Sequence, residues 1–194
     1  MKIAEAVQCA AVFLQLNELA EAMDSPDFNA NAPEQTLGAE NAAELDLLVR
    51  CCNLVLFELA DTDFPLRAQT RVNAENGRID YSRLPQKITD IVSVTAGGKS
   101  LPVCRYFDCI TVPYSGECVV TYTFAPAKAA LGDVSPYACG KPSARAVAYG
   151  IAREYCQISG MLDEASVWDG RFAAAITEQA RGKREKRVKP RTWR

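Results

Sequence analysis

The pattern of apolar and polar positions divides the chain into helical ends and a strand-rich middle. Between Gly77 and Pro126, short runs rich in β-branched and aromatic residues alternate with turn-forming Pro and Gly residues, at a spacing of roughly ten residues. Strands are expected at 77–81, 88–95, 106–112 and 117–124. The last run places Cys118, Val120, Tyr122 and Phe124 on one face, as is typical of a half-buried antiparallel strand.

The close spacing of these strands leaves no room for crossover helices between them. The middle of the chain therefore predicts an antiparallel β module of four or five strands, either a small barrel or a meander.

Helical periodicity lies on both sides of this module. Residues 2–22 predict one amphipathic helix, and the turn-formers of 24–33 predict a loop after it. Residues 39–60 carry an apolar stripe wide enough to predict a helix buried between partners. After the module, Ser143 is the expected N-cap of a helix that Gly160 ends, and a final helix is expected over about 163–181.

A helix with a wide apolar face must bury that face against another element, so the helices from the two ends of the chain are expected to form one bundle. The predicted fold is α+β: a helical bundle from N- and C-terminal helices with an inserted antiparallel β module. The expected segments are 1–68 for the N-terminal helices of the bundle, 69–126 for the β module, 127–180 for the C-terminal helices, and 181–194 for a basic C-terminal arm.

The composition is that of an ordinary globular protein, with 48% apolar and 24% charged residues. The N-terminal segment lacks the uninterrupted apolar core of a signal peptide, and no stretch approaches the roughly 18 apolar residues of a membrane span. We therefore expect a protein that is made in the cytoplasm and has no membrane partner.

Candidate chemistry is sparse. The eight cysteines include no Cys-x-x-Cys pair and there is no histidine, so the cysteines are interpreted as buried and reduced, and no Ser-His or Cys-His pair can form. The segment 96–100 (Ala-Gly-Gly-Lys-Ser) resembles the end of a phosphate-binding loop, but Ser93 stands where the motif needs glycine and strand sequence follows it. A glycine-rich hairpin turn with an exposed Lys99 is the better interpretation. No catalytic residue, cofactor or metal ligand is predicted, and the chain is not expected to be an enzyme.

The charges are distributed unevenly along the chain. The net charge is −2, yet residues 181–194 carry eight Lys or Arg residues and one Glu. This basic arm is the candidate partner-binding segment, and Trp193 is its candidate apolar anchor. The residues assigned to it are Arg181, Lys183, Arg184, Lys186, Arg187, Lys189, Arg191, Trp193 and Arg194.

The order of parts resembles a known family. Two N-terminal helices, the phrase Asp63-Phe-Pro-Leu-Arg67, a β module, and the phrases at 148–156 and 164–172 are similar to the neck proteins of tailed phages and prophages, of the tail tubular protein A type. The resemblance spans nearly the whole chain and rests on layout and aromatic-rich phrases. It includes no catalytic or metal motif.

The resemblance implies a structural subunit of the phage head-tail connector, located in the neck of the virion. It implies a homo-oligomeric ring, with a dodecamer as the suggested size, that joins the portal protein to the tail proteins, and contact with packaged DNA in the channel is one partner it leaves open. The alternative left open by the residues is a nucleic-acid-binding accessory protein that uses the basic arm to hold phosphates.

Overall fold

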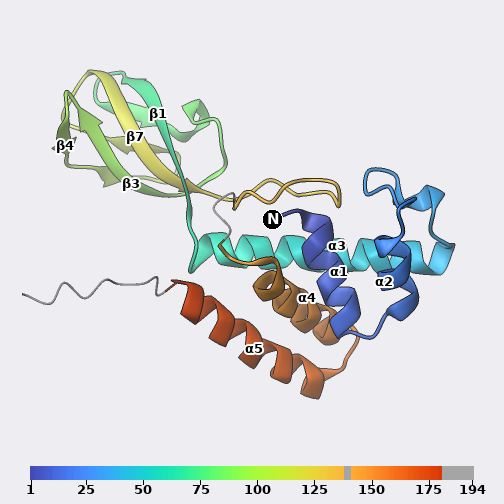
Figure 1. The fold of residues 1–194 in the computed structure, drawn as a ribbon. Coiled ribbons are helices and arrows are strands. Elements are labelled where there is room, and N and C mark those ends of the chain that lie inside the picture. Colours follow the sequence, from blue (N-terminus) through green and yellow to red (C-terminus); the bar gives the residue numbers. More distant parts are fainter. Residues whose placement is uncertain (138–140, 181–194) are drawn as a thin grey trace, which may run out of the picture.

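The structure is a computed structural model that describes residues 1–137 and 141–180. It is an α+β protein in which a helical bundle carries a separate antiparallel β module (Figure 1). Each part has its own cluster of buried apolar side chains. The predicted fold class is confirmed.

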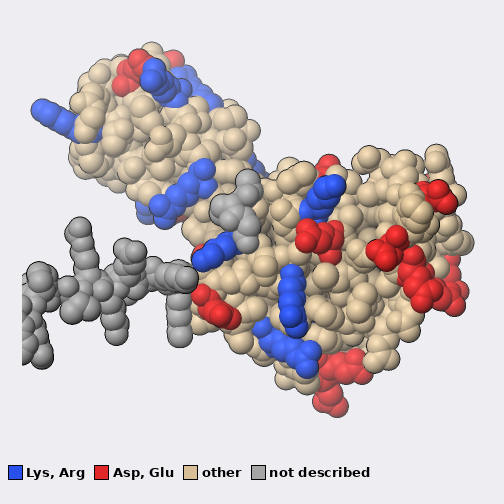
Figure 2. Space-filling model, in the orientation of Figure 1, with Lys and Arg blue, Asp and Glu red and all other residues tan. Residues whose placement is uncertain are grey.

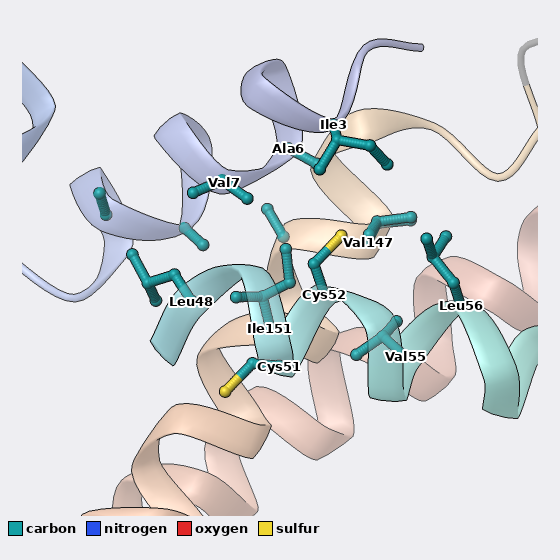
Figure 3. Close-up of a cluster of buried hydrophobic side chains, with 14 of the residues drawn as sticks. Ile3, Ala6, Val7, Leu48, Cys51, Cys52, Val55, Leu56, Val147 and Ile151 are labelled. Carbon is teal, nitrogen blue, oxygen red and sulfur yellow. The ribbon is translucent and has the colours of Figure 1, made fainter. Parts of the chain in front are cut away.

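Helices from both ends of the chain build the bundle. They are α1 (Ile3–Phe13), α2 (Asn17–Asp24), α3 (Ala39–Asp61), α4 (Ala144–Ile158) and α5 (Leu162–Ala180), with a short 3₁₀ turn at Pro33–Gln35. Their apolar faces meet in one core, where Val7 of α1, Leu48 of α3 and Ile151 of α4 are all fully buried (Figure 3). The expected common bundle is therefore present.

Gly150 lets three of these helices approach closely. A Cβ atom placed on Gly150 of α4 would lie 2.8 Å from Val55 Cγ1 of α3 and 3.0 Å from the Phe172 ring of α5. Only a residue without a side chain fits at this crossing.

The prediction of one helix over 2–22 was wrong. The chain breaks between α1 and α2, where Gln15 adopts a left-handed conformation with φ of 58°. The Leu16 N–H donates to the Ala11 carbonyl at 3.0 Å, and the Gln15 N–H donates to the Val12 carbonyl at 3.2 Å. This is the hydrogen-bond pattern of a Schellman cap, with glutamine in the position that glycine usually takes. The break turns α2 so that Leu19 is buried in the core.

The β module contains two antiparallel sheets. The first has the order β1-β7-β3-β4, and the second has the order β2-β6-β5. The strands are β1 (Leu66–Ala74), β2 (Arg78–Asp80), β3 (Ile88–Ala96), β4 (Lys99–Leu101), β5 (Cys104–Arg105), β6 (Cys109–Thr111) and β7 (Gly116–Phe124). The sheets form neither a closed barrel nor a meander, because β7 lies between β1 and β3.

The sequence did not predict β1, which pairs with β7 along all nine of its residues. This strand also begins at Leu66, inside the segment that was assigned to the helix junction. Its Arg, Gln, Asn and Thr residues hide the strand pattern, and only Val72 and Ala74 are buried. The strand expected over 106–112 is shorter than predicted, because only Cys109–Thr111 pairs as β6.

After β7 the chain returns to the bundle and is fixed there by hydrogen bonds. The Asn53 side chain of α3 donates to the Ala129 carbonyl at 3.0 Å and accepts from the Ala129 N–H at 2.8 Å. The Ile3 N–H donates to the Asp133 carbonyl at 3.0 Å. Ser143 then caps α4 as predicted, because its side chain accepts from the Ala146 N–H.

Candidate functional site

The residues that the sequence assigned to partner binding all belong to the basic arm at 181–194. They lie outside the described residues, so the arm stays a prediction. The described part of the chain ends with Ala180, the last residue of α5.

The glycine pair at 97–98 forms the predicted hairpin turn. Gly97 and Gly98 have φ of 54° and 78°, and they connect β3 to β4 with Ala96 paired to Lys99. Two successive positive φ angles are typical of a type I′ hairpin. A strand follows, so no helix N-terminus is available to hold a phosphate.

One group of potential metal ligands occurs among the described residues. The carboxylate oxygens of Asp80 and Asp108 and the Cys109 sulfur lie within 4.8 Å of one another. Arg78 already satisfies both carboxylates, with its Nε donating to Asp80 and its Nη2 to Asp108, each at 2.7 Å. Hydrogen bonds from the Cys109 thiol and from Arg78 hold the pKa of Asp108 below its usual value, and burial raises the pKa of Cys109. The thiol therefore stays protonated, and the group is best explained as an ion-pair cluster.

The cysteines offer no redox pair within the described chain. The seven cysteines in it are free, and burial raises the pKa of Cys51 and of Cys52 to about 12. The interpretation as buried thiols holds for five of the seven, since Cys9 is half-buried and Cys104 is exposed. Protonated, buried thiols of this kind behave as small apolar groups.

A buried arginine connects three helices. Arg153 of α4, only 8% exposed, donates to Glu154 at 2.7 Å and to Asp169 of α5 at 3.2 Å, and it forms a bidentate pair with Glu58 of α3. Its guanidinium also lies 4.9 Å from the centre of the Phe172 ring. Burial by itself would lower the pKa of Arg153, but the hydrogen bonds to its carboxylate partners raise it overall. This network fixes the arrangement of α3, α4 and α5, and we assign it a structural role.

Three aromatic rings meet where the end of α1 reaches α4 and α5. We call Phe13, Tyr149 and Trp168 the aromatic triad. Their ring centres are 5.2–5.9 Å apart, and their planes differ by 18–24°. Two guanidinium groups flank them: Arg145 lies 5.7 Å from the Tyr149 ring centre, and Arg171 lies 4.7 Å from the Trp168 ring centre. No described carboxylate forms a salt bridge with either arginine. The result is a surface of half-buried rings with two cations held against it.

A hollow of about 430 Å³ opens beside this triad, and we call it the corner hollow. Val167 on its wall is 56% exposed, and Val12 and Leu162 nearby in the sequence are also exposed. Large apolar side chains exposed beside a hollow are a feature of interaction sites. The lining residues are Phe13, Leu14, Gln15, Met161, Glu164, Val167, Trp168 and Arg171.

Negative charge is concentrated at one end of the bundle, formed by α2 and the first half of α3. We call residues 17–49 the acidic end, because they contain eight carboxylates and no Lys or Arg. Figure 2 shows acidic side chains gathered there. A hollow of about 560 Å³ between α2 and α3 is lined by Glu18, Glu40 and Glu44, and Glu44 Oε2 is buried without a hydrogen-bond partner among the described residues. The acidic end therefore suits a cationic partner.

An exposed aromatic tip projects from the β module. We call Tyr106–Asp108, the connection between β5 and β6, the β tip. Phe107 is fully exposed, and the neighbouring Tyr106 is 58% exposed. The backbone around them is held firmly: the Tyr106 N–H donates to the Cys109 carbonyl at 2.9 Å, and the Tyr81 hydroxyl donates to the Tyr106 carbonyl at 3.0 Å.

Comparison with known proteins assigns no family. No protein-family model matches the chain, and no curated protein sequence matches it. In the described residues, no helix is long and apolar enough to cross a membrane.

Sequence reasoning missed the aromatic triad, the corner hollow and the β tip. Trp168 falls on the apolar face of a predicted helix, where it is interpreted as an ordinary core residue, and Phe13 lies within another predicted helix. The pattern along one chain does not tell which residue lies at an open edge. Phe107 fell within a predicted strand. The acidic end could have been found, since the absence of Lys and Arg over 17–49 is visible in the sequence.

Proposed function

We propose that this chain is a structural subunit of the head-tail connector of a tailed phage, and that its copies form a homo-oligomeric ring between the portal protein and the tail. The proposal includes no catalytic step and no cofactor. Its place of action would be the neck of the virion.

An acidic end of the bundle and a basic segment that follows α5 in the sequence carry this proposal. The acidic end of the bundle lies far from the point where the described part of α5 stops (Figure 1). The basic arm, with eight cations and one carboxylate, follows α5 directly in the sequence. A subunit with different complementary surfaces at its two ends associates head to tail, and head-to-tail contacts close into a ring when the rotation between copies permits.

The length of the arm supports contact between copies. Fourteen residues span up to roughly 45 Å when fully extended. A single exposed ion pair contributes only about 0–1 kcal/mol, so several cations must act together on the acidic end. Trp193 would add an apolar contact that salt does not screen.

The deciding experiment measures ring formation and binding to the portal protein by native mass spectrometry and cryo-electron microscopy. Truncation after Arg181 should leave the melting temperature of the fold nearly unchanged and should lower assembly, and Trp193→Ala should reproduce part of that loss at low salt. A truncated chain that assembles as well as the full chain contradicts a role for the arm.

Charge reversal at the acidic end gives a matched test. The double variant Glu18→Lys/Glu40→Lys should weaken assembly, whereas Glu178→Lys, at an exposed position on α5, should not. If instead the full chain remains monomeric and the arm retains it on DNA in a salt-dependent manner, the nucleic-acid-binding function replaces the structural one.

A further inference from the structure

We propose that the β tip of one copy docks into the corner hollow of the next copy, with Phe107 as the inserted side chain. The occupant is a second copy of this chain. The contact would be an interface between neighbouring subunits of the proposed ring, and the inference rests on that proposed function. It is a contact between folded surfaces and does not involve the basic arm.

One of the two surfaces is an exposed ring and the other is a hollow. The β tip presents a fully exposed phenyl ring on a backbone that hydrogen bonds hold on both sides. The corner hollow is a depression of about 430 Å³ in which aromatic and aliphatic side chains lie beside Gln15, Glu164 and Arg171. An aromatic anchor that enters a preformed apolar pocket loses little conformational freedom on binding, and such anchors supply most of the affinity of typical interfaces.

Their charges are complementary as well. The Asp108 side chain beside Phe107 is 65% exposed and is the charged residue of the β tip; Arg78 of β2 lies against it at 2.7 Å. The charged residues that line the corner hollow are Glu164 and Arg171, and Arg171 forms no salt bridge with a described carboxylate. Phe107 inserted beside Trp168 would bring the Asp108 carboxylate toward the unpaired Arg171, a charge-assisted contact.

One molecule does not fill its own hollow. The corner hollow lies where α1 ends and α5 begins, and in Figure 1 this corner of the bundle is remote from the β module. The donor and acceptor surfaces are different patches of the same chain, so the contact is heterologous and propagates from copy to copy. A projecting apolar group that fits a pocket elsewhere on the same molecule is the arrangement that generates rings or filaments.

The test uses one variant of each surface in the full-length chain. Phe107→Asp removes the anchor, and Val167→Asp places a charge in the wall of the hollow; both side chains are well exposed, so folding should be retained. The matched controls are Val92→Asp on the β module and Leu54→Asp on the bundle, at exposed apolar positions outside the two surfaces. Self-association is followed by sedimentation velocity and native mass spectrometry.

Each surface variant should weaken self-association by about 30-fold, the effect expected for loss of a hot-spot contact. The controls should assemble as the unmodified chain does. A mixture of the two surface variants should recover a one-to-one contact between the two variants, because Phe107 of one variant can still enter the intact hollow of the other. Reversal of charge by Arg171→Glu should also weaken association.

The possible failures are distinguishable. If rings form and Phe107→Asp or Val167→Asp assembles normally, the docking inference is overturned while the ring survives. If the unmodified chain remains monomeric at high concentration and on the phage particle, both are overturned. If Val167→Asp loses binding to the portal protein but retains self-association, the hollow belongs to a different partner and the assignment to a second copy is overturned.

Discussion

The helical bundle and the β module of this protein assemble their buried apolar cores from the chain in different ways. The module is built from one continuous stretch, β1 to β7, and its core residues all come from 72–122. The bundle core combines α1 and α3 with α4 and α5, although more than 80 residues separate Asp61 from Ala144. A local core can form by itself, whereas a core shared between distant segments needs the whole chain.

The largest effect is expected from removal of half of the bundle core. Deletion of residues 143–180 removes the partners of Leu48, Val55 and Val7 and leaves their apolar faces exposed. The remaining fragment should aggregate and should melt without cooperativity, as measured by circular dichroism and light scattering.

The isolated β module, unlike half of the bundle, is expected to fold by itself. A fragment of residues 64–126 should show a cooperative, although low, melting transition, because its buried cluster is complete but small. A soluble 1–142 fragment whose helices melt cooperatively would contradict the idea that the bundle needs both ends of the chain.

The second largest effect on stability is expected from arginine substitutions. The bundle and the β module each contain one arginine that forms several ion pairs, Arg153 and Arg78 respectively. Arg153→Met leaves Glu58, Glu154 and Asp169 facing one another without their common cation, and it should lower the free energy of unfolding by roughly 3 kcal/mol. Arg78→Met in the β module breaks ion pairs that are open to water, so its effect on chemical denaturation should be much smaller. Equal changes in the free energy of unfolding for the two substitutions would contradict the idea that burial makes the Arg153 ion pairs more important for stability than those of Arg78.

A third test uses two helical glycines with opposite surroundings. Gly150→Ala places a methyl group against Val55 and Phe172 and should destabilise the bundle by about 1–2 kcal/mol, even after the gain in helix propensity. Gly170→Ala on α5 meets no atom within 4 Å and should stabilise it by about 0.5–1 kcal/mol. Changes of the same sign at both positions in urea denaturation would contradict the close packing of α3, α4 and α5.

The smallest effect is expected at the turn between β3 and β4. Lys99→Ala should change neither the melting temperature nor any nucleotide binding, because the residue is exposed in a hairpin that offers no helix N-terminus to phosphate. Saturable binding of ATP, measured by calorimetry and abolished by this substitution, would contradict the hairpin interpretation.

The sequence was sufficient to predict those helices, caps and strand faces that depend on a local pattern of residues. The buried stripe over 39–60 matches α3, Ser143 caps α4, and Gly160 ends it with φ of 77°. The alternation of residues 118–122 matches the burial of β7. These features depend on helical or strand periodicity and on residues with special backbone preferences, both of which act over a few neighbouring positions.

Tertiary structure decided the features for which no local signal exists. Gln15 takes a left-handed conformation because the break lets α2 cover the core with Leu19, and β1 is a strand because β7 pairs with it along its length. The exposure of Phe107, the corner hollow and the four-residue network around Arg153 also depend on contacts between residues far apart in the chain. By itself the sequence determined the periodic elements, their caps and the distribution of charge, while long-range packing determined which apolar and charged groups were left without a partner within the molecule.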